Sequence, residues 1–203
     1  MTALAARAPM PATYDDLLAL PEHLIGEIID GDLIASPRPA PAHAAATSSV
    51  GSALHAPYHR RPGDPNGPGG WWILDEPELH LGRHVLVPDL AGWRRERLPA
   101  LPETAYFALP PDWVCEVVSP GSVRRDRVQK MRIYGEFGVA WLWLVVPEQQ
   151  LVEVFERQGD RWLLAGTAVG HEAEARLPPF DAVPLDLARW WDVGDPVGSP
   201  ASP

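Results

Sequence analysis

Two stretches of this chain are apolar on both faces of an extended strand, and they constrain the fold more than any other feature. Residues 113–118 read Trp-Val-Cys-Glu-Val-Val, and residues 141–146 read Trp-Leu-Trp-Leu-Val-Val. A strand with apolar side chains on both sides needs both sides covered, in the centre of a sheet or at a subunit contact. With 203 residues, 46% of them hydrophobic, the chain is long enough to build such a core in one domain.

The signals around these strands predict an α/β fold with a mixed central β-sheet, flanking helices and a C-terminal extension rich in strands. A helical pattern begins after Thr13 and stops before Pro21, and an Asp30-Gly31 turn joins the two strands of a hairpin. Further helices are expected at 43–58 and 123–137. Further strands are expected at 71–74, 78–81, 85–93, 113–118, 141–146, 151–157 and 161–168.

Composition suggests where the domain begins and ends. Residues 1–12 are rich in Ala and interrupted by Pro, and residues 193–203 are rich in Pro, Gly and Ser, so we expect disordered ends around a single domain at 13–192. No apolar stretch in the N-terminal segment is long enough for a signal peptide or a membrane span. Cys115, the only cysteine, excludes an internal disulfide and fits a reducing cytoplasm.

The charge balance argues against a protein that coats nucleic acid. The net charge is −10 and the pI is about 5.1, whereas contacts to many phosphates require clustered basic residues. Three local clusters exist, which matter only if they converge on one cleft: Arg60-Arg61; Arg94, Arg95 and Arg97; and Arg124, Arg125, Arg127 and Arg132. Trp141 and Trp143 are interpreted as core or interface residues rather than platforms for stacked bases.

Two carboxylates stand in apolar surroundings. Asp89 follows Pro88 at the end of an apolar run, and Glu116 lies within strand 113–118. Burying a carboxylate costs several kcal/mol unless it is paired or coordinates a metal. Two such acids on neighbouring strands could hold a hard cation such as Mg²⁺ while leaving positions open to water. The alternative is structural, with Asp89 capping a strand end and Glu116 pairing with a buried arginine.

Lys130 is the only lysine beside sixteen arginines, and it lies in the predicted helix 123–137. A guanidinium is a broad fork that is always charged, whereas an ammonium is a compact donor that burial and neighbouring charges can tune. A lone lysine therefore suggests a position that requires an ammonium, near a phosphate or a water. The alternative is chance retention on a solvated helical face.

These residues resemble the PD-(D/E)xK nuclease superfamily, and within it the Uma-type family of bacterial restriction endonucleases. Pro88-Asp89 matches the first half of the motif and Glu116 the second, while Val118 stands where the usual lysine would be. One branch of the superfamily carries that lysine on the following helix, and Lys130 looks like such a displaced group. The similarity runs from about Tyr14 to Trp191.

The resemblance implies a restriction-endonuclease-like core and a set of site residues. Asp89 and Glu116 would be ligands of Mg²⁺, with Mn²⁺ as a substitute, and Lys130 would be the catalytic ammonium. Glu27 looks like an additional acid near the site, although in a hairpin strand it could equally be plain surface. DNA would be the substrate, bound weakly by the isolated domain, and a homodimer is expected.

Four further side chains have both functional and structural interpretations. Asp126 precedes Lys130 by four residues and could form an ordinary helical ion pair or orient the ammonium. Ser119 could donate to a water but is better explained as part of a turn. His43 stands at a helix start, where a polar residue usually caps. Tyr134 falls on the helical face of Lys130 and could cover it or belong to the core.

Three functions remain open. The first is a Mg²⁺-dependent phosphodiesterase acting on DNA, in which Lys130→Ala and Asp89→Asn abolish cleavage without unfolding the chain. The second is a non-catalytic binding or accessory module of a mobile-element or defence system, in which Glu116 and Lys130 form a closed ion-pair network. The third is a hydrolase of another phosphoester with the same site, because a fold alone does not determine the substrate.

Overall fold

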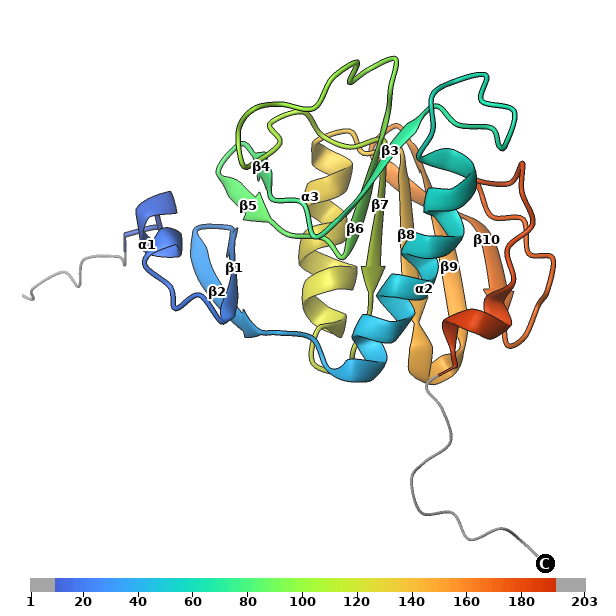
Figure 1. The fold of residues 1–203 in the computed structure, drawn as a ribbon. Helices are drawn as coiled ribbons and strands as arrows, with labels where there is room; N and C mark the ends of the chain where they lie inside the picture. The colour runs from blue at the N-terminus through green and yellow to red at the C-terminus, as the bar shows by residue number, and fades with distance from the viewer. Residues whose placement is uncertain (1–9, 193–203) are drawn as a thin grey trace, which may run out of the picture.

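The computed structural model describes residues 10–192 and contains two β-sheets (Figure 1). The larger sheet has six strands in the order β10-β9-β8-β7-β6-β3, and the smaller has four in the order β2-β1-β5-β4. Only β7 and β8 pair in parallel, so the larger sheet is mixed, as predicted. The expected disorder of residues 1–9 and 193–203 lies outside the described residues.

The strands have the following bounds. The larger sheet consists of β3 (Trp71–Asp75), β6 (Leu90–Arg94), β7 (Trp113–Val117), β8 (Trp141–Val146), β9 (Leu151–Gln158) and β10 (Arg161–Val169). The smaller sheet consists of β1 (Leu24–Ile29), β2 (Asp32–Pro37), β4 (Leu79–Leu81) and β5 (His84–Leu86). The strands expected in a C-terminal extension are thus β8, β9 and β10 of the main sheet.

Helices cover both faces of the larger sheet (Figure 1). α2 (Pro41–Tyr58) packs on one face, and the continuous pair η1 (Arg125–Lys130) and α3 (Met131–Glu136) lies on the other. The short elements are α1 (Tyr14–Leu18), η2 (Pro147–Gln149) and η3 (Leu187–Trp190). No helix among residues 10–192 has the length and apolarity needed to cross a membrane.

The two central strands are buried on both faces, as their sequences predict. Trp113 and Cys115 of β7 pack in the core under α2, whereas Val114 packs in a second core with α3 and the smaller sheet. Trp143 of β8 is fully buried, which confirms the core interpretation over base stacking. Because the side chains of β7 alternate, Glu116 points to the same side as Val114, towards the helix that carries Lys130.

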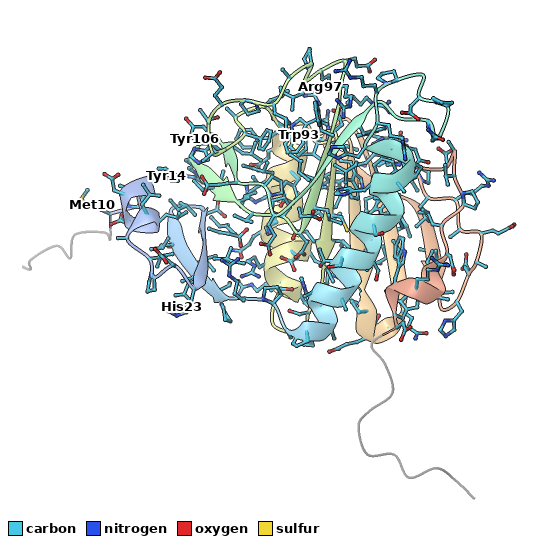
Figure 2. The ribbon with its side chains drawn as sticks, viewed as in Figure 1. Met10, Tyr14, His23, Trp93, Arg97 and Tyr106 are labelled. Atoms are coloured by element: carbon cyan, nitrogen blue, oxygen red, sulfur yellow. The ribbon has the colours of Figure 1, made fainter. Side chains whose placement is uncertain are left out.

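Local signals explain the N-terminal elements. Thr13 and Asp16 form a reciprocal capping box at the start of α1. Asp30 (φ 55°) and Gly31 (φ 90°) both adopt the left-handed conformation that a tight hairpin turn between β1 and β2 requires. Tyr14 of α1 packs edge-on against His80 of β4, which fixes this segment to the smaller sheet (Figure 2).

The single strand predicted at 85–93 is wrong. It is divided into β5 and β6, which belong to different sheets, and the break is the Val87-Pro88-Asp89 segment. Proline has no N–H to donate to a ladder, so a strand does not run through this position without interruption. The backbone groups of Val87 instead form hydrogen bonds with side chains. Its N–H donates to Glu27 Oε1, and its carbonyl accepts from Lys130 Nζ.

The helix predicted at 123–137 forms, but its first half is π-helical. Residues Arg125–Lys130 have this geometry, and the Met131 N–H bonds to the Asp126 carbonyl five residues earlier. Gly138 ends the segment with a φ of 82°, as expected of a C-terminal glycine. π-helical turns are rare and occur often at functional sites. This one turns both Asp126 and Lys130 inward.

Candidate active site

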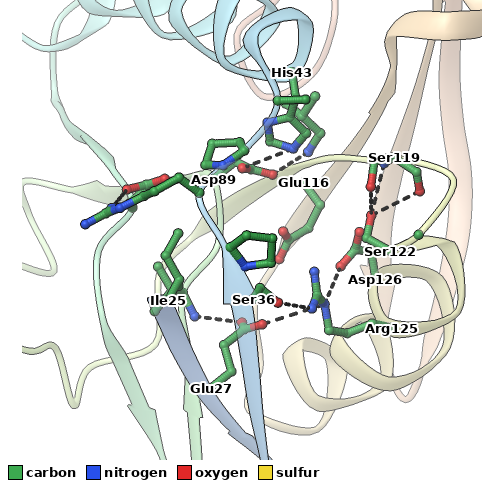
Figure 3. A pocket seen from close by; sticks show the side chains of 18 of the residues that line it. Ile25, Glu27, Ser36, His43, Asp89, Glu116, Ser119, Ser122, Arg125 and Asp126 are labelled. Carbon is green, nitrogen blue, oxygen red and sulfur yellow. Dashed lines mark hydrogen bonds and ion pairs between the residues drawn. The ribbon is translucent and has the colours of Figure 1, made fainter. Parts of the chain in front are cut away.

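A cavity of about 360 Å³ opens where the hairpin, the β5–β6 break, the end of β7, η1 and the start of α2 meet (Figure 3). Its lining includes all four residues expected at the site, which are Glu27, Asp89, Glu116 and Lys130. They come from β1, the break, β7 and η1, so the fold brings together side chains that are far apart in the sequence.

Asp89 is held against β7 by a main-chain contact. Its Oδ2 accepts a hydrogen bond of 2.7 Å from the Val117 N–H, and its Oδ1 lies 3.5 Å from Nε2 of His43. Burial raises the pKa of Asp89 above its ordinary value, although His43, the Val117 N–H and Lys130 oppose the rise. The carboxyl group is therefore fixed in position and poorly hydrated.

Glu116 is the most deeply desolvated acid of the site, with 2% of its surface exposed. Its Oε1 lies 2.8 Å from Nζ of Lys130 and accepts a hydrogen bond of 2.5 Å from the Tyr134 hydroxyl. Burial raises the pKa of Glu116 to about 8, with smaller contributions from neighbouring carboxylates and an opposing one from Lys130. Tyr134 thus belongs to the core and also contacts the site.

Lys130 is equally buried, and its ammonium has three acceptors. These are Glu116 Oε1 at 2.8 Å, Glu27 Oε1 at 3.0 Å and the Val87 carbonyl at 3.2 Å. Burial lowers the pKa of Lys130, but Glu116 and Glu27 outweigh that effect and raise it above the ordinary value. The interpretation of Lys130 as a residue on a solvated face is therefore wrong.

Glu27 is part of this cluster rather than plain surface, because only 4% of it is exposed. Its Oε1 bridges Lys130 Nζ and the Val87 N–H, so one carboxylate ties the hairpin to both the break and the helix. Among residues 10–192, the ion pairs of Lys130 are those with Glu27 and Glu116. Asp126 instead lies 3.6 Å from Nε of Arg125, so of its two interpretations the direct helical ion pair with Lys130 does not form.

Arg125 is the site residue that the sequence analysis did not single out. Its Nη1 donates to Ser36 Oγ at 2.9 Å, and its Nε lies 3.7 Å from Glu27 Oε2. Its side chain is 26% exposed, so it is the more accessible cation beside the buried Lys130. Figure 3 shows it reaching from the helix towards the hairpin. The only signal in the sequence was its place in an arginine cluster.

The three arginine clusters do not converge on the cavity. Of their members in the described chain, Arg125 is the one that lines it, and Arg38, which belongs to none of the clusters, lies at the rim beside Glu76 at 3.7 Å. Ser119 and Ser122 bond to each other in the turn after β7, as the structural interpretation of Ser119 predicts, and both also line the cavity. The lining of the cavity therefore contains more acids than basic residues: the acids are Glu27, Glu76, Asp89, Glu116 and Asp126, and the basic residues are Arg38, Arg125 and Lys130, with His43.

The donor set suits a hard divalent cation with few protein ligands. Asp89 and Glu116 both line the cavity, and the observed contacts of Glu116 all involve Oε1. Residues 10–192 contain no group of three or more His, Cys, Asp or Glu side chains arranged to hold a metal ion. Mg²⁺ is commonly held by one or two carboxylates together with water and substrate phosphates, so two acids fit it.

Comparisons with known proteins agree with this architecture. A family model described as "Uma2: Putative restriction endonuclease" matches residues 12–193. The chain is also similar to a solved structure described as "a putative nuclease belonging to DUF820 from Anabaena variabilis ATCC 29413". The identity is 24% and the TM-score 0.69, with 89% of this chain and 98% of that chain covered, which shows a shared fold.

No curated protein matches the chain. The family match nevertheless covers nearly all of the described residues, and it agrees with the resemblance inferred from Pro88-Asp89, Glu116 and Lys130. The protein therefore belongs to the Uma2 family, whose model is described as "Putative restriction endonuclease".

Proposed function

We propose that this protein is a Mg²⁺-dependent endonuclease that hydrolyses DNA phosphodiester bonds, with Asp89 and Glu116 holding the cation. The observation that carries the proposal is the presence of the partly buried Asp89 and the fully buried Glu116 on one cavity beside a buried ammonium. A bound Mg²⁺ or Mn²⁺ would supply charge neutralisation at the phosphate and activation of a water. Incubation of supercoiled plasmid with the protein and either ion tests this directly, since nicked or linear product is expected.

The side chains around the cavity hold the two acids in position. The Val117 N–H fixes Asp89, while Lys130 and the Tyr134 hydroxyl fix Glu116. The positive charge of Lys130 also offsets the negative charges of Glu27, of Glu116 and of the phosphate that enters the cavity. Preorganisation of this kind places charge where the reaction needs it without rearrangement of the site.

Arg125 is the residue we expect to contact the phosphate of the substrate. Lys130 already has three acceptors, whereas Arg125 is partly exposed on the cavity wall. A guanidinium suits phosphate because its donors form a planar fork. Its contacts with Ser36 and Glu27 would hold it in place before the substrate arrives.

Replacement of Arg125 by Met should slow single-turnover DNA cleavage by about tenfold to a hundredfold, the worth of one charge-assisted hydrogen bond. Mn²⁺ affinity should be unchanged, because Arg125 is not among the proposed ligands. Arg124→Met is the matched control, since Arg124 is exposed and lies one position earlier. Equal rates for the two variants would show that Arg125 does not contact the substrate.

Affinity for Mn²⁺ should rise as the pH is increased from 6 to 8. The pKa of Glu116 is raised to about 8, so at pH 6 most of this carboxyl holds a proton that the cation must displace. Each unit of increase in pH, up to pH 8, should strengthen Mn²⁺ binding by up to about tenfold. Calorimetric titrations at several pH values measure this. Glu116→Gln should bind weakly and with a shallower pH dependence, whereas equal affinity at pH 6 and 8 in the wild type would contradict the role of Glu116.

A second candidate function is the non-catalytic accessory module. The observation that favours it is that Glu27, Glu116 and the Val87 carbonyl already satisfy the ammonium of Lys130. Thermal unfolding with increasing Mn²⁺ separates the two, because only a ligand that binds the folded chain raises Tm with concentration. DNA as the partner, a homodimer and a cytoplasmic location stay predictions.

A further inference from the structure

A group of arginines and tryptophans lies at the end of the larger sheet opposite to the cavity. We call it the arginine–tryptophan patch and define it as Trp71, Trp72, Arg94, Arg95 and Arg61. The tryptophans begin the edge strand β3, Arg94 ends β6, and Arg61 follows α2 in the chain. In Figure 2 the nearby Arg97 marks this end of the molecule.

Arg94 of β6 and Arg95 of the following turn lie over the indole rings. The guanidinium carbon of Arg95 lies 3.4 Å from the centre of the Trp72 ring, and that of Arg94 lies 4.6 Å from the centre of the Trp71 ring. The Arg95 Nε also donates to the Trp71 carbonyl at 3.0 Å. Stacking of this kind orders a guanidinium and leaves its edge available to a further acceptor.

The Arg94 N–H donates to the Asp112 carboxylate at 2.8 Å, but no guanidinium of the patch has an acidic partner in the described part of the chain. Arg61, Arg94 and Arg95 form no ion pair among residues 10–192, whereas the adjacent Arg60 and Arg97 are neutralised. Arg60 lies 3.5 Å from Asp64, and Arg97 lies 2.7 Å from Asp112. Burial and the nearby Arg61 lower the pKa of Arg95, as expected for cations held together without a counter-charge.

This local excess of positive charge contrasts with the net charge of −10 on the whole chain. Like charges brought together on a folded surface repel one another, so their grouping needs a compensating interaction. An anionic partner provides it. The patch also lies at a sheet edge, because β3 has a neighbour on one side only.

The arrangement of the guanidiniums favours a polyanion over a small anion. Trp71 and Trp72 are successive residues of β3 and point to opposite faces, so Arg94 and Arg95, which stack on them, lie on different sides of the sheet. Arg94 lies opposite Trp71 in the β3–β6 ladder. Cations separated in this way fit a chain of repeated phosphates better than one enclosed ion.

We propose that the arginine–tryptophan patch binds the phosphate backbone of duplex DNA. The proposal rests on the nuclease function proposed above and adds a contact outside its cavity. Arg94 and Asp89 are separated by the length of β6, about 17 Å at 3.4 Å per residue. Contact with the patch would therefore engage phosphates other than the one to be cleaved.

The test is equilibrium binding of a fluorescently labelled DNA duplex to the full chain, measured by anisotropy in EDTA over a series of salt concentrations. The variant is Arg61→Glu with Arg94→Glu; Arg95 is kept because its stacking and hydrogen bond contribute to the fold. The control is Arg161→Glu with Arg189→Glu, which changes the charge equally on exposed residues away from the patch. Circular dichroism verifies the folding of both.

We expect the patch variant to bind duplex at least about tenfold more weakly than the control at about 100 mM salt. The slope of log affinity against log salt should fall by about 2, because each lost phosphate contact removes about 0.9. An equal loss of duplex affinity in the patch variant and in the control variant would overturn the proposal. So would a wild-type protein that does not bind duplex.

The same experiment distinguishes failure of the patch from failure of the proposed function. Because EDTA removes the cation, Asp89→Asn should bind duplex at least as well as the wild type. A protein that binds duplex through the patch but takes up no Mn²⁺ would refute the nuclease function alone. A protein that cleaves DNA while the patch variant binds like the control would refute the patch alone.

Discussion

Replacement of Asp89 by Asn should reduce DNA cleavage at least about a hundredfold and leave the fold intact. The loss follows from removal of one of the two carboxylates that we propose to hold the cation, whose charge stabilisation is worth several kcal/mol. The fold should survive because the Asn side-chain carbonyl can still accept the hydrogen bond of the Val117 N–H. Burial also disfavours the charge of Asp89, so its removal costs the folded state little.

Single-turnover cleavage with Mg²⁺, together with thermal unfolding of the same preparations, measures both effects. Asp112→Asn is the matched control, because Asp112 is another buried acid that lies outside the cavity and pairs with Arg97. That variant should keep the activity of the wild type. An Asp89→Asn protein that cleaves at the wild-type rate would remove Asp89 from the site and with it the proposed mechanism.

Replacement of Lys130 by Met should lower the free energy of unfolding by about 3–5 kcal/mol. The ammonium is paired with Glu116 and Glu27 in a buried cluster, so its loss leaves desolvated carboxylates without a counter-charge. This expectation differs from the nuclease hypothesis of the sequence analysis, in which the fold survives Lys130→Ala, and agrees with the accessory-module hypothesis, in which Glu116 and Lys130 form a closed ion-pair network. Urea unfolding at about pH 9, above the raised pKa of Glu116, followed by circular dichroism measures the change with both carboxylates ionised.

A double variant separates the lost ion pair from lost packing. Lys130→Met combined with Glu116→Gln should be more stable than the sum of the single changes implies, because the second change removes a charge that the first left unpaired. Arg132→Met is the control on α3: Arg132 is exposed and pairs with Asp30, so about 1 kcal/mol or less is expected. A similarly small effect for Lys130→Met would show that the cluster does not support the fold.

Much of the fold could be predicted from local patterns. The apolar sequences of β7 and β8 predicted that both strands lie in the centre of the sheet, and the Asp30-Gly31 turn predicted the hairpin. These features depend on residues close together in the sequence. The break at Pro88 was the main error, since apolar residues on both sides of it suggested one strand although the two halves belong to different sheets.

The sequence predicted that the candidate residues lie together, but it did not predict their contacts. Asp89, Glu116 and Lys130 stood out by residue type and surroundings, and the structure places all three on one cavity. The link between Glu27 and Lys130 joins residues more than a hundred positions apart, so it depends on topology that no local pattern contains. Arg125 was not singled out because its inward position depends on the π-helical turn, which has no recognised sequence signal here.

The central claim is that Asp89 and Glu116 together hold a divalent cation, and calorimetric titration with Mn²⁺ tests it most directly. If the two acids hold the cation, Mn²⁺ should bind saturably to the folded wild type at pH 8. Its affinity should be at least about tenfold weaker in Asp89→Asn and in Glu116→Gln. Circular dichroism must show that all three proteins are folded. No heat of binding to the wild type, or equal affinity in the three proteins, would contradict the claim and favour the closed ion-pair network of an accessory module.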